Sequence, residues 1–162
     1  MVRVPGEGRT IALGDAGIVT LKATGADTDG TVSAYEFAVP PRTAGPPVHL
    51  HRNWHETFYV LAGEMTFLID GERRAAPAGT LVYIPCGVPH TFWNEGDAPA
   101  MQLTVFTPSG IEDYFDDLTR VLEAPDDETR AAAEALMERH DMVVVPDARP
   151  AYGTLGQDPS DV

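Results

Sequence analysis

Apolar and polar residues alternate in short runs over most of residues 9–108. In TVSAYEFAV, every second residue from Ser33 to Val39 falls on one face, opposite Glu36. This period of two is typical of a half-buried β-strand. Glycine and proline punctuate the runs, and Asp70-Gly71 predicts a hairpin. Regular short strands of this kind favour a β-sandwich or barrel over β-α-β units. Strands are expected in 9–13, 17–24, 31–39, 56–62, 64–70, 80–85, 90–94 and 99–108.

The pattern changes at Ser109, which is expected to form a capping box with Glu112. Apolar residues then recur at helical spacing over 111–122, which predicts an amphipathic helix. Pro125 is expected to end this helix, and a second helix is predicted over 126–139.

The segment MVVVP at 142–146 is expected to form a short strand or an extended strap. These patterns divide the chain into four regions, and the last of them is rich in Pro, Gly and Asp and is expected to be flexible. The regions are N-terminal strands at 1–30, a barrel core at 31–108, C-terminal helices and a strap at 109–146, and a tail at 147–162.

Composition narrows the classes of partner. The formal charge of −14 argues against nucleic acid and anionic membranes as partners, because both attract basic surfaces. A single cysteine excludes an intrachain disulfide. The N-terminus lacks the apolar core of a signal peptide, and no apolar run approaches the length that spans a membrane. A cytoplasmic protein is therefore expected.

The candidate chemistry is concentrated in two segments, GPPVHLHRNWHETFYVLAG and GTLVYIPCGVPHTFWN. The first contains His49 and His51, which would share one face of a strand about 7 Å apart, and then Glu56. The second contains His90 after a proline-rich turn. Three neutral imidazoles and a carboxylate suit one divalent transition metal such as Fe, Mn, Co, Ni, Cu or Zn. A buried Glu56 without a partner would be costly, and a metal supplies that partner.

These residues resemble the two motifs of the cupin superfamily, over roughly residues 30–108. The second motif matches at every position. The first departs once, because Gly45 lies four residues before His49 where the family pattern has six, and the ligand spacing is intact. The matching patterns are His49-x-His51-x4-Glu56-x6-Gly63 and Gly79-x5-Pro85-x-Gly87-x2-His90-x3-Asn94.

The resemblance implies an all-β fold, namely a cupin-like antiparallel β-barrel (jelly roll) with a short C-terminal two-helix appendage. Together with the helix opening TPSGIEDYFDDL, the first motif resembles the quercetinase-like single-domain cupins. In those enzymes the positions that match His49, His51, Glu56 and His90 bind a metal, and an activated enol is cleaved with dioxygen. The resemblance thus implies a dioxygenase with one metal per chain, in which Glu56 accepts the enol proton.

Two other functions stay open. The metal, zinc for example, would act as a Lewis acid in an isomerisation, a dehydration or the cyclisation of a polyketide. Alternatively, the barrel binds a small molecule without turnover. The sequence leaves the choice of metal and substrate open.

Strand parity predicts an apolar pocket beside the metal, and only Arg42 and Arg52, both on loops, would be near enough to bind an anionic group. The predicted ligand is therefore a planar, apolar small molecule such as a polyphenol or diketone, in preference to a sugar phosphate. The predicted pocket residues are Tyr35, Phe37, Phe58, Phe67, Phe92 and Leu103.

Several residues are assigned no catalytic or metal-binding role. His55 has the opposite strand parity from Glu56 and is expected to point away from the metal. His140 suits the C-terminal end of a helix dipole, Cys86 fills a turn, and Asn94 is expected to hydrogen-bond within a turn. The predicted sheet edges need cover, so a homodimer is expected.

Overall fold

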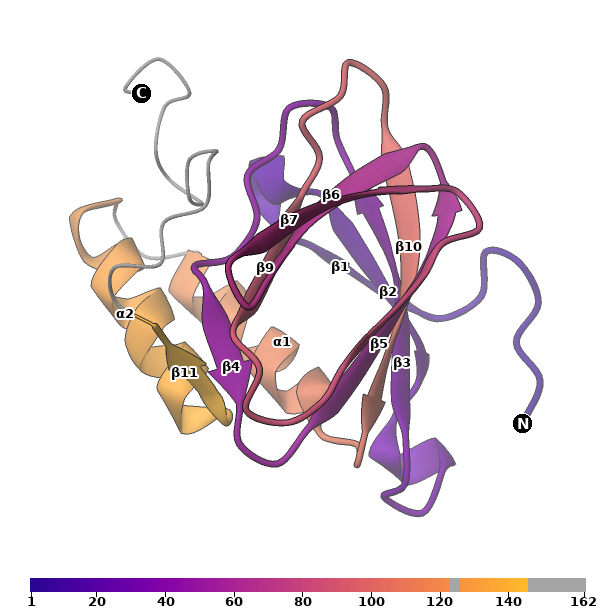
Figure 1. Cartoon of the computed structure of the whole chain (residues 1–162). Coiled ribbons are helices and arrows are strands. Elements are labelled where there is room, and N and C mark those ends of the chain that lie inside the picture. The colour runs from indigo at the N-terminus through magenta and orange to yellow at the C-terminus, as the bar shows by residue number, and fades with distance from the viewer. Residues whose placement is uncertain (123–125, 146–162) are drawn as a thin grey trace.

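The computed structural model of the chain describes residues 1–122 and 126–145 (Figure 1). The predicted tail at 147–162 and the expected helix stop at Pro125 lie outside the described residues.

Two antiparallel sheets face each other across the core, which confirms the all-β jelly-roll fold. The strands form two sheets rather than one closed barrel. The larger sheet has the order β1 (Arg9–Ala12), β2 (Ile18–Ala23), β3 (Ser33–Val39), β10 (Ala100–Thr107), β5 (His55–Ala62) and β8 (Leu81–Ile84). The smaller sheet has the order β11 (Met142–Val144), β4 (His49–His51), β9 (His90–Trp93), β6 (Glu64–Ile69) and β7 (Glu72–Pro77). Two short 3-10 helices, at Gly14–Ala16 and Gly25–Asp27, flank β2.

The expected hairpin at Asp70-Gly71 joins β6 to β7. Ile69 pairs with Glu72, so the loop contains two residues. Asp70 and Gly71 have φ values of 49° and 78°. Positive φ at both central residues is what a type I′ turn requires, and the Asp-Gly pair tolerates it.

Strand β10 presents its polar residues to the interior, and the predicted inward position of Leu103 is therefore wrong. Leu103 and Val105 lie half-buried on the outer side, whereas Gln102 and Thr104 are fully buried. Thr104 lies opposite Tyr35 in the pairing of β10 with β3 and forms a hydrogen bond with its hydroxyl. Hydrophobicity alone therefore predicts the wrong inward face for β10. The polar face can be buried because these polar groups bond to one another.

The predicted C-terminal helices are α1 (Ile111–Leu122) and α2 (Asp126–Arg139). Ile111, Phe115 and Leu118 form the buried side of α1. These buried residues recur along α1 at the helical spacing that the sequence predicted.

The helix start differs from the predicted capping box. The amide of Ser109 donates to the carbonyl of Gly30. The carboxylate of Glu112 accepts hydrogen bonds from the amide of Gly25 at 2.6 Å and from the hydroxyl of Ser33. Glu112 also accepts from the amide of Gly110 at 3.2 Å. It thus ties α1 to β3 and bonds the start of its own helix at Gly110 rather than at Ser109.

The C-terminal segment returns to the sheet that carries the histidines. Strand β11 pairs with β4, and Met142 lies opposite His51. Just before β11, Asp141 accepts hydrogen bonds from the amide and side chain of Asn53 at 2.7 and 2.9 Å. In Figure 1, α1, α2 and β11 gather on one side of the fold, next to β4. The appendage therefore lies beside the two histidines of β4.

Candidate metal centre

Four side chains from three strands converge in the space between the sheets. His49 and His51 occupy the two ends of β4, and His90 begins β9 opposite His49. Glu56 lies on β5 in the other sheet. One candidate ligand atom from each residue lies within 4.8 Å of the others. The structure thus brings together the four residues that the sequence singled out.

The carboxylate of Glu56 is the hub of this cluster. Its Oε2 atom lies 2.8 Å from Nε2 of His90 and 3.2 Å from Nε2 of His51. All four residues are buried, with at most 4% of their surface exposed. A polar group so far from water needs partners within the protein or a bound cation.

Backbone carbonyls orient two of the imidazoles. Nδ1 of His49 donates to the carbonyl of Pro47 at 2.9 Å, and Nδ1 of His90 donates to that of Val88 at 2.9 Å. A proton on Nδ1 leaves Nε2 of a neutral imidazole with a lone pair for a metal. The backbone thus prepares both rings as nitrogen ligands.

A glycine allows the chain to enter β4 at this place. A Cβ atom on Gly45 would lie 1.5 Å from the carbonyl oxygen of Phe92. No other residue fits so close an approach of two backbone segments. Gly45 therefore allows the segment that leads into β4 to pack closely against β9, the strand that carries His90.

The pKa values follow from burial and from the contacts of Glu56. Burial, reinforced by the charges of His90 and His51, lowers the pKa of His49 from 6.5 to about 3. Burial raises the pKa of Glu56, but hydrogen bonds from His51 and His90 outweigh it and lower that pKa to about 2. Burial lowers the pKa of His90, whereas its hydrogen bond to Glu56 and the charge of Glu56 raise it overall. The centre therefore holds an anionic carboxylate that favours a protonated His90 or a bound cation beside it.

The donor set fits a divalent transition metal. Three imidazoles and one carboxylate are borderline ligands that suit Fe, Mn, Co, Ni, Cu or Zn. Nδ1 of His51 is buried without a hydrogen-bond partner, so this ring is oriented by the contact of its Nε2 with Glu56 and by packing. Its packing neighbours are Trp54 and Phe106, whose ring centroids lie 5.6 and 5.4 Å from that of His51.

An apolar cavity reaches the cluster from the side of the helices. His49 and Glu56 line it together with the tyrosines Tyr35 and Tyr114, and apolar residues make up most of the remaining wall. The wall contains residues of both sheets and of both helices. The apolar side chains include Leu13, Val19, Phe37, Phe92, Ile111, Phe115, Leu118, Met137 and Met142.

The predicted pocket residues fall into three groups. Tyr35, Phe37 and Phe92 line the cavity. Phe58 and Phe67 are completely buried in the core, with ring centroids 5.0 Å apart. Leu103 lies on the outer side of its sheet, as described above.

Sequence reasoning missed the contribution of the helices to the cavity. Tyr114 on α1 and Met137 on α2 both belong to its wall. The apolar stripe of α1 was a visible signal that this helix covers something, but the stripe does not say which surface it covers. Burial raises the pKa of Tyr114 to about 12, so its hydroxyl is a hydrogen-bond donor at neutral pH.

The residues that were assigned no role lie away from the cluster. His55 is exposed, and its Nδ1 bonds the hydroxyl of Tyr83 at 2.8 Å. His140 pairs with Asp117, with Nε2 2.9 Å from Oδ2. Asn94 donates to the carbonyls of Pro40 and Ala98, both at 2.9 Å, and so bonds turn segments to each other. Cys86 is a free cysteine. Of the two loop arginines, neither lines the cavity.

Comparisons with known proteins agree with this architecture. Residues 35–106 match the sequence model of the family described as Cupin domain. A segment of 46 residues, 28% of this chain, is 39% identical to quercetin 2,3-dioxygenase of Bacillus subtilis, and it spans only 14% of that enzyme.

Solved structures show the same fold. The polyketide cyclase RemF of Streptomyces resistomycificus superimposes with a TM-score of 0.57 at 23% identity, over 67% of this chain and 80% of that one. A predicted oxalate decarboxylase of Thermotoga maritima gives a TM-score of 0.58 at 20% identity, over 67% of this chain and 98% of that one. Among the described residues, no helix is long and apolar enough to cross a membrane. The cytoplasmic location stays a prediction.

Proposed function

We propose, from the premise that residues 35–106 form a domain of the cupin family, that this chain is a metal-dependent enzyme acting on a planar, largely apolar enol or phenol. The proposed reaction is a dioxygenation of the quercetinase type. The segment similar to quercetin 2,3-dioxygenase supports this choice.

The observation that carries the proposal is the cavity that ends at His49 and Glu56. Its wall is apolar except for these two residues and the hydroxyls of Tyr35 and Tyr114. Pockets of this kind bind apolar molecules and orient them through a few polar groups. The wall contains no Lys or Arg among the described residues, so a phosphate or carboxylate would have no cationic partner there.

A divalent metal held by His49, His51, Glu56 and His90 would supply Lewis acidity to an enol oxygen. The aromatic wall excludes water and strengthens electrostatic interactions inside the cavity. A ring with one polar end would lie along Phe37 and Phe92 with that end at Glu56. The protein thus positions the substrate before any bond changes.

Glu56 is the proposed proton acceptor. Hydrogen bonds from His51 and His90 help to keep its pKa at about 2, which makes it a weak base in this state. An imidazole nitrogen that binds a metal carries no proton and cannot donate a hydrogen bond. Metal loading would remove these two donors, but a divalent cation bound to the carboxylate would itself lower its basicity. Proton abstraction would therefore require Glu56 to leave the metal and act as a free carboxylate.

A second candidate is a non-redox isomerase, cyclase or dehydratase. The two tyrosine hydroxyls favour it, because burial raises the pKa of both Tyr35 and Tyr114 and keeps them protonated. In such a step the carboxylate would accept a proton and the protonated phenols would stabilise the developing oxyanion by hydrogen bonding. Binding without turnover is the third candidate.

Oxygen uptake separates the three candidates. Metal-loaded protein is incubated with flavonols, diketones and polyketide-like phenols, while dissolved oxygen and products are followed together. Uptake that requires both the metal and Glu56 is the result expected of the dioxygenase. Product without uptake would move the assignment to the non-redox class, and tight binding without product would leave a binding protein.

A further inference from the structure

The cavity beside the metal centre is too small for the ligand proposed above. Its volume is about 80 Å³. By comparison, an apolar protein cavity of about 150 Å³ binds one benzene molecule. A flavonol contains several rings, so part of the cavity wall must move before such a ligand reaches His49 and Glu56.

The sheets supply the part of the wall that is held most firmly. Tyr35 and Phe37 lie on β3, which pairs with β2 on one side and with β10 on the other. Phe92 lies on β9, between β4 and β6. Displacing a central strand breaks two ladders of backbone hydrogen bonds, and core strands open only at a free energy close to that of global unfolding. This part of the wall is therefore fixed.

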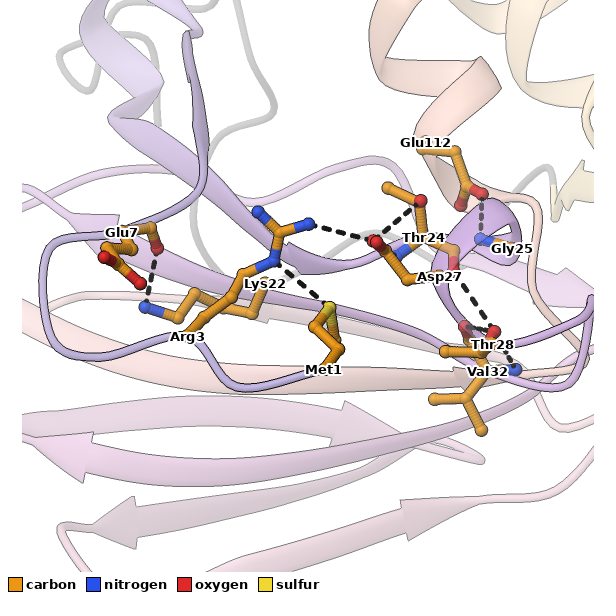
Figure 2. A network of polar contacts seen from close by, with 10 residues as sticks. All are labelled: Met1, Arg3, Glu7, Lys22, Thr24, Gly25, Asp27, Thr28, Val32 and Glu112. Carbon is orange, nitrogen blue, oxygen red and sulfur yellow. Dashed lines mark hydrogen bonds and ion pairs between the residues drawn. The ribbon is translucent and has the colours of Figure 1, made fainter.

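Helix α1 is anchored to the larger sheet at its start. Figure 2 shows the carboxylate of Glu112 beside the amide of Gly25, which donates to it at 2.6 Å. The same carboxylate accepts from the hydroxyl of Ser33 on β3. One turn further along the helix, Asp116 forms an ion pair with Arg9 of β1. These contacts hold the α1 part of the wall in place.

The wall contributed by α2 and β11 is held differently. This α2–β11 segment, residues 126–145, places Met137 and Met142 in the wall, and both side chains are buried. Its strand β11 has three residues and lies at the edge of the smaller sheet, where it pairs with β4. A short edge strand separates from its sheet at a lower free energy than a central strand does. The α2–β11 segment is therefore the part of the wall that can move.

Two exposed hydrogen bonds fasten this segment to the loop between β4 and β5. Asp141, directly before β11, accepts from the amide and the side chain of Asn53 at 2.7 and 2.9 Å. A further contact joins His140 to Asp117 of α1, with 2.9 Å between Nε2 and Oδ2. Because water competes for exposed hydrogen bonds, the two bonds to Asn53 break at a small cost in free energy. They suit a latch that closes reversibly.

We propose that the α2–β11 segment is a lid, which leaves β4 to admit the ligand and is closed by the latch between Asp141 and Asn53. Closure would bring Met137 and Met142 against the ligand and exclude water from Glu56. The size of the ligand comes from the proposed function, on which this inference rests, whereas the movement of the lid is measured without any turnover.

The first test measures opening of the lid in protein without ligand or metal. Cys86 is the one cysteine of the chain, so Met137→Cys in Cys86→Ser protein places a single thiol in the cavity wall, where the native side chain is 2% exposed. A maleimide reaches this thiol only when the lid is open. Asp141→Gly removes both latch bonds, and glycine adopts the φ of 65° at this position without strain. Labelling should become about 10-fold faster.

Asp29→Gly is the matched control for the latch. Asp29 has a similar φ of 51° but lies between the 3-10 helix Gly25–Asp27 and β3. It should leave the labelling rate unchanged. An unchanged rate in Asp141→Gly, or an equal acceleration in Asp29→Gly, would overturn the inference.

The second test locks the lid with a disulfide. Leu50 on β4 and Val143 on β11 lie directly opposite each other, and both side chains are half-buried. Such a pair is within reach of a disulfide. The oxidised Leu50→Cys/Val143→Cys variant, again in Cys86→Ser protein, should bind a flavonol at least about 10-fold more slowly than the reduced variant. The metal content of the two forms should be equal.

Thr10→Cys/Thr20→Cys is the control for the lock, because these residues lie opposite each other on β1 and β2, outside the lid. Oxidation of this variant should leave the rate of flavonol binding unchanged. Equal rates for the oxidised and reduced lid variant would overturn the inference. Failure of every protein to bind a flavonol would instead contradict the proposed function, and the labelling rates would still decide whether the lid opens.

Discussion

Oε2 of Glu56 and Nε2 of His90 lie 2.8 Å apart although they belong to different sheets. All three histidines come from β4 and β9 of the smaller sheet, and the carboxylate comes from β5 of the larger one. A metal bound here would join the two halves of the sandwich. The centre therefore links metal binding to the stability of the whole fold.

Replacing His90 by alanine should remove most of the bound metal. The variant loses one of three imidazoles and leaves Glu56 with one fewer buried donor. A metal at 100 times its Kd stabilises the folded state by about 2.7 kcal/mol. For a chain of this size, its loss should lower Tm by about 5–10 °C. Elemental analysis and thermal melts with and without a chelator measure the two effects.

His55→Ala is the control for this prediction, since His55 is exposed and contacts Tyr83 instead of the cluster. It should retain its metal. Full metal content in the His90→Ala variant would show that the four residues do not act as one site.

Replacing Glu56 by glutamine should reduce turnover more than substrate affinity. The amide keeps the size of the side chain but cannot accept the substrate proton, so kcat should fall by about 100-fold or more while KM changes little. Rates are compared at equal metal occupancy, which elemental analysis supplies. An unchanged kcat would remove Glu56 from the proposed role.

Tyr114→Phe should weaken ligand binding without loss of metal. The hydroxyl lies in the cavity wall, and one lost hydrogen bond corresponds to a roughly 2- to 10-fold increase in Kd. Titration of the metal-loaded protein with a flavonol measures this increase in Kd. Tyr59→Phe, on the outer side of the sheet, should leave Kd unchanged. Equal Kd values for all three proteins would contradict a role of Tyr114 in binding.

Acidification should destabilise the metal-free protein. The pKa of His49 is depressed from 6.5 to about 3, so its contribution to stability is complete above 6.5 and is lost as the pH falls toward 3. The depressed pKa of Glu56 acts in the same direction between 4.5 and about 2. The raised pKa of His90 acts in the opposite direction, because its contribution is present below 6.5 and is lost as the pH rises through the folded value.

Thermal melts of the metal-free protein between pH 7 and pH 3 test these signs. Tm should fall across this range, and the fall should be smaller in His49→Phe, which cannot be protonated. A Tm that rises on acidification would mean that the His90 contribution outweighs the other two.

The spacing of ligands and the strand pattern could be read from the sequence because both are local. Residues two apart on a strand share a face, so His49 and His51 had to lie together, and the alternation from Ser33 to Val39 had to bury Tyr35 and Phe37. Helical spacing likewise located α1, with Ile111, Phe115 and Leu118 on one side.

Only the tertiary structure decided which surfaces meet. Leu103 is more apolar than Thr104, yet the register with β3 places Thr104 opposite Tyr35 in the interior. The stripe of α1 indicated burial, but not that Tyr114 would lie in the wall of the cavity that reaches Glu56. Local patterns report which residues share a face, but not which face turns inward. What that face contacts depends on pairings between distant segments, such as β11 with β4, which form only because the closed core satisfies apolar and polar groups together.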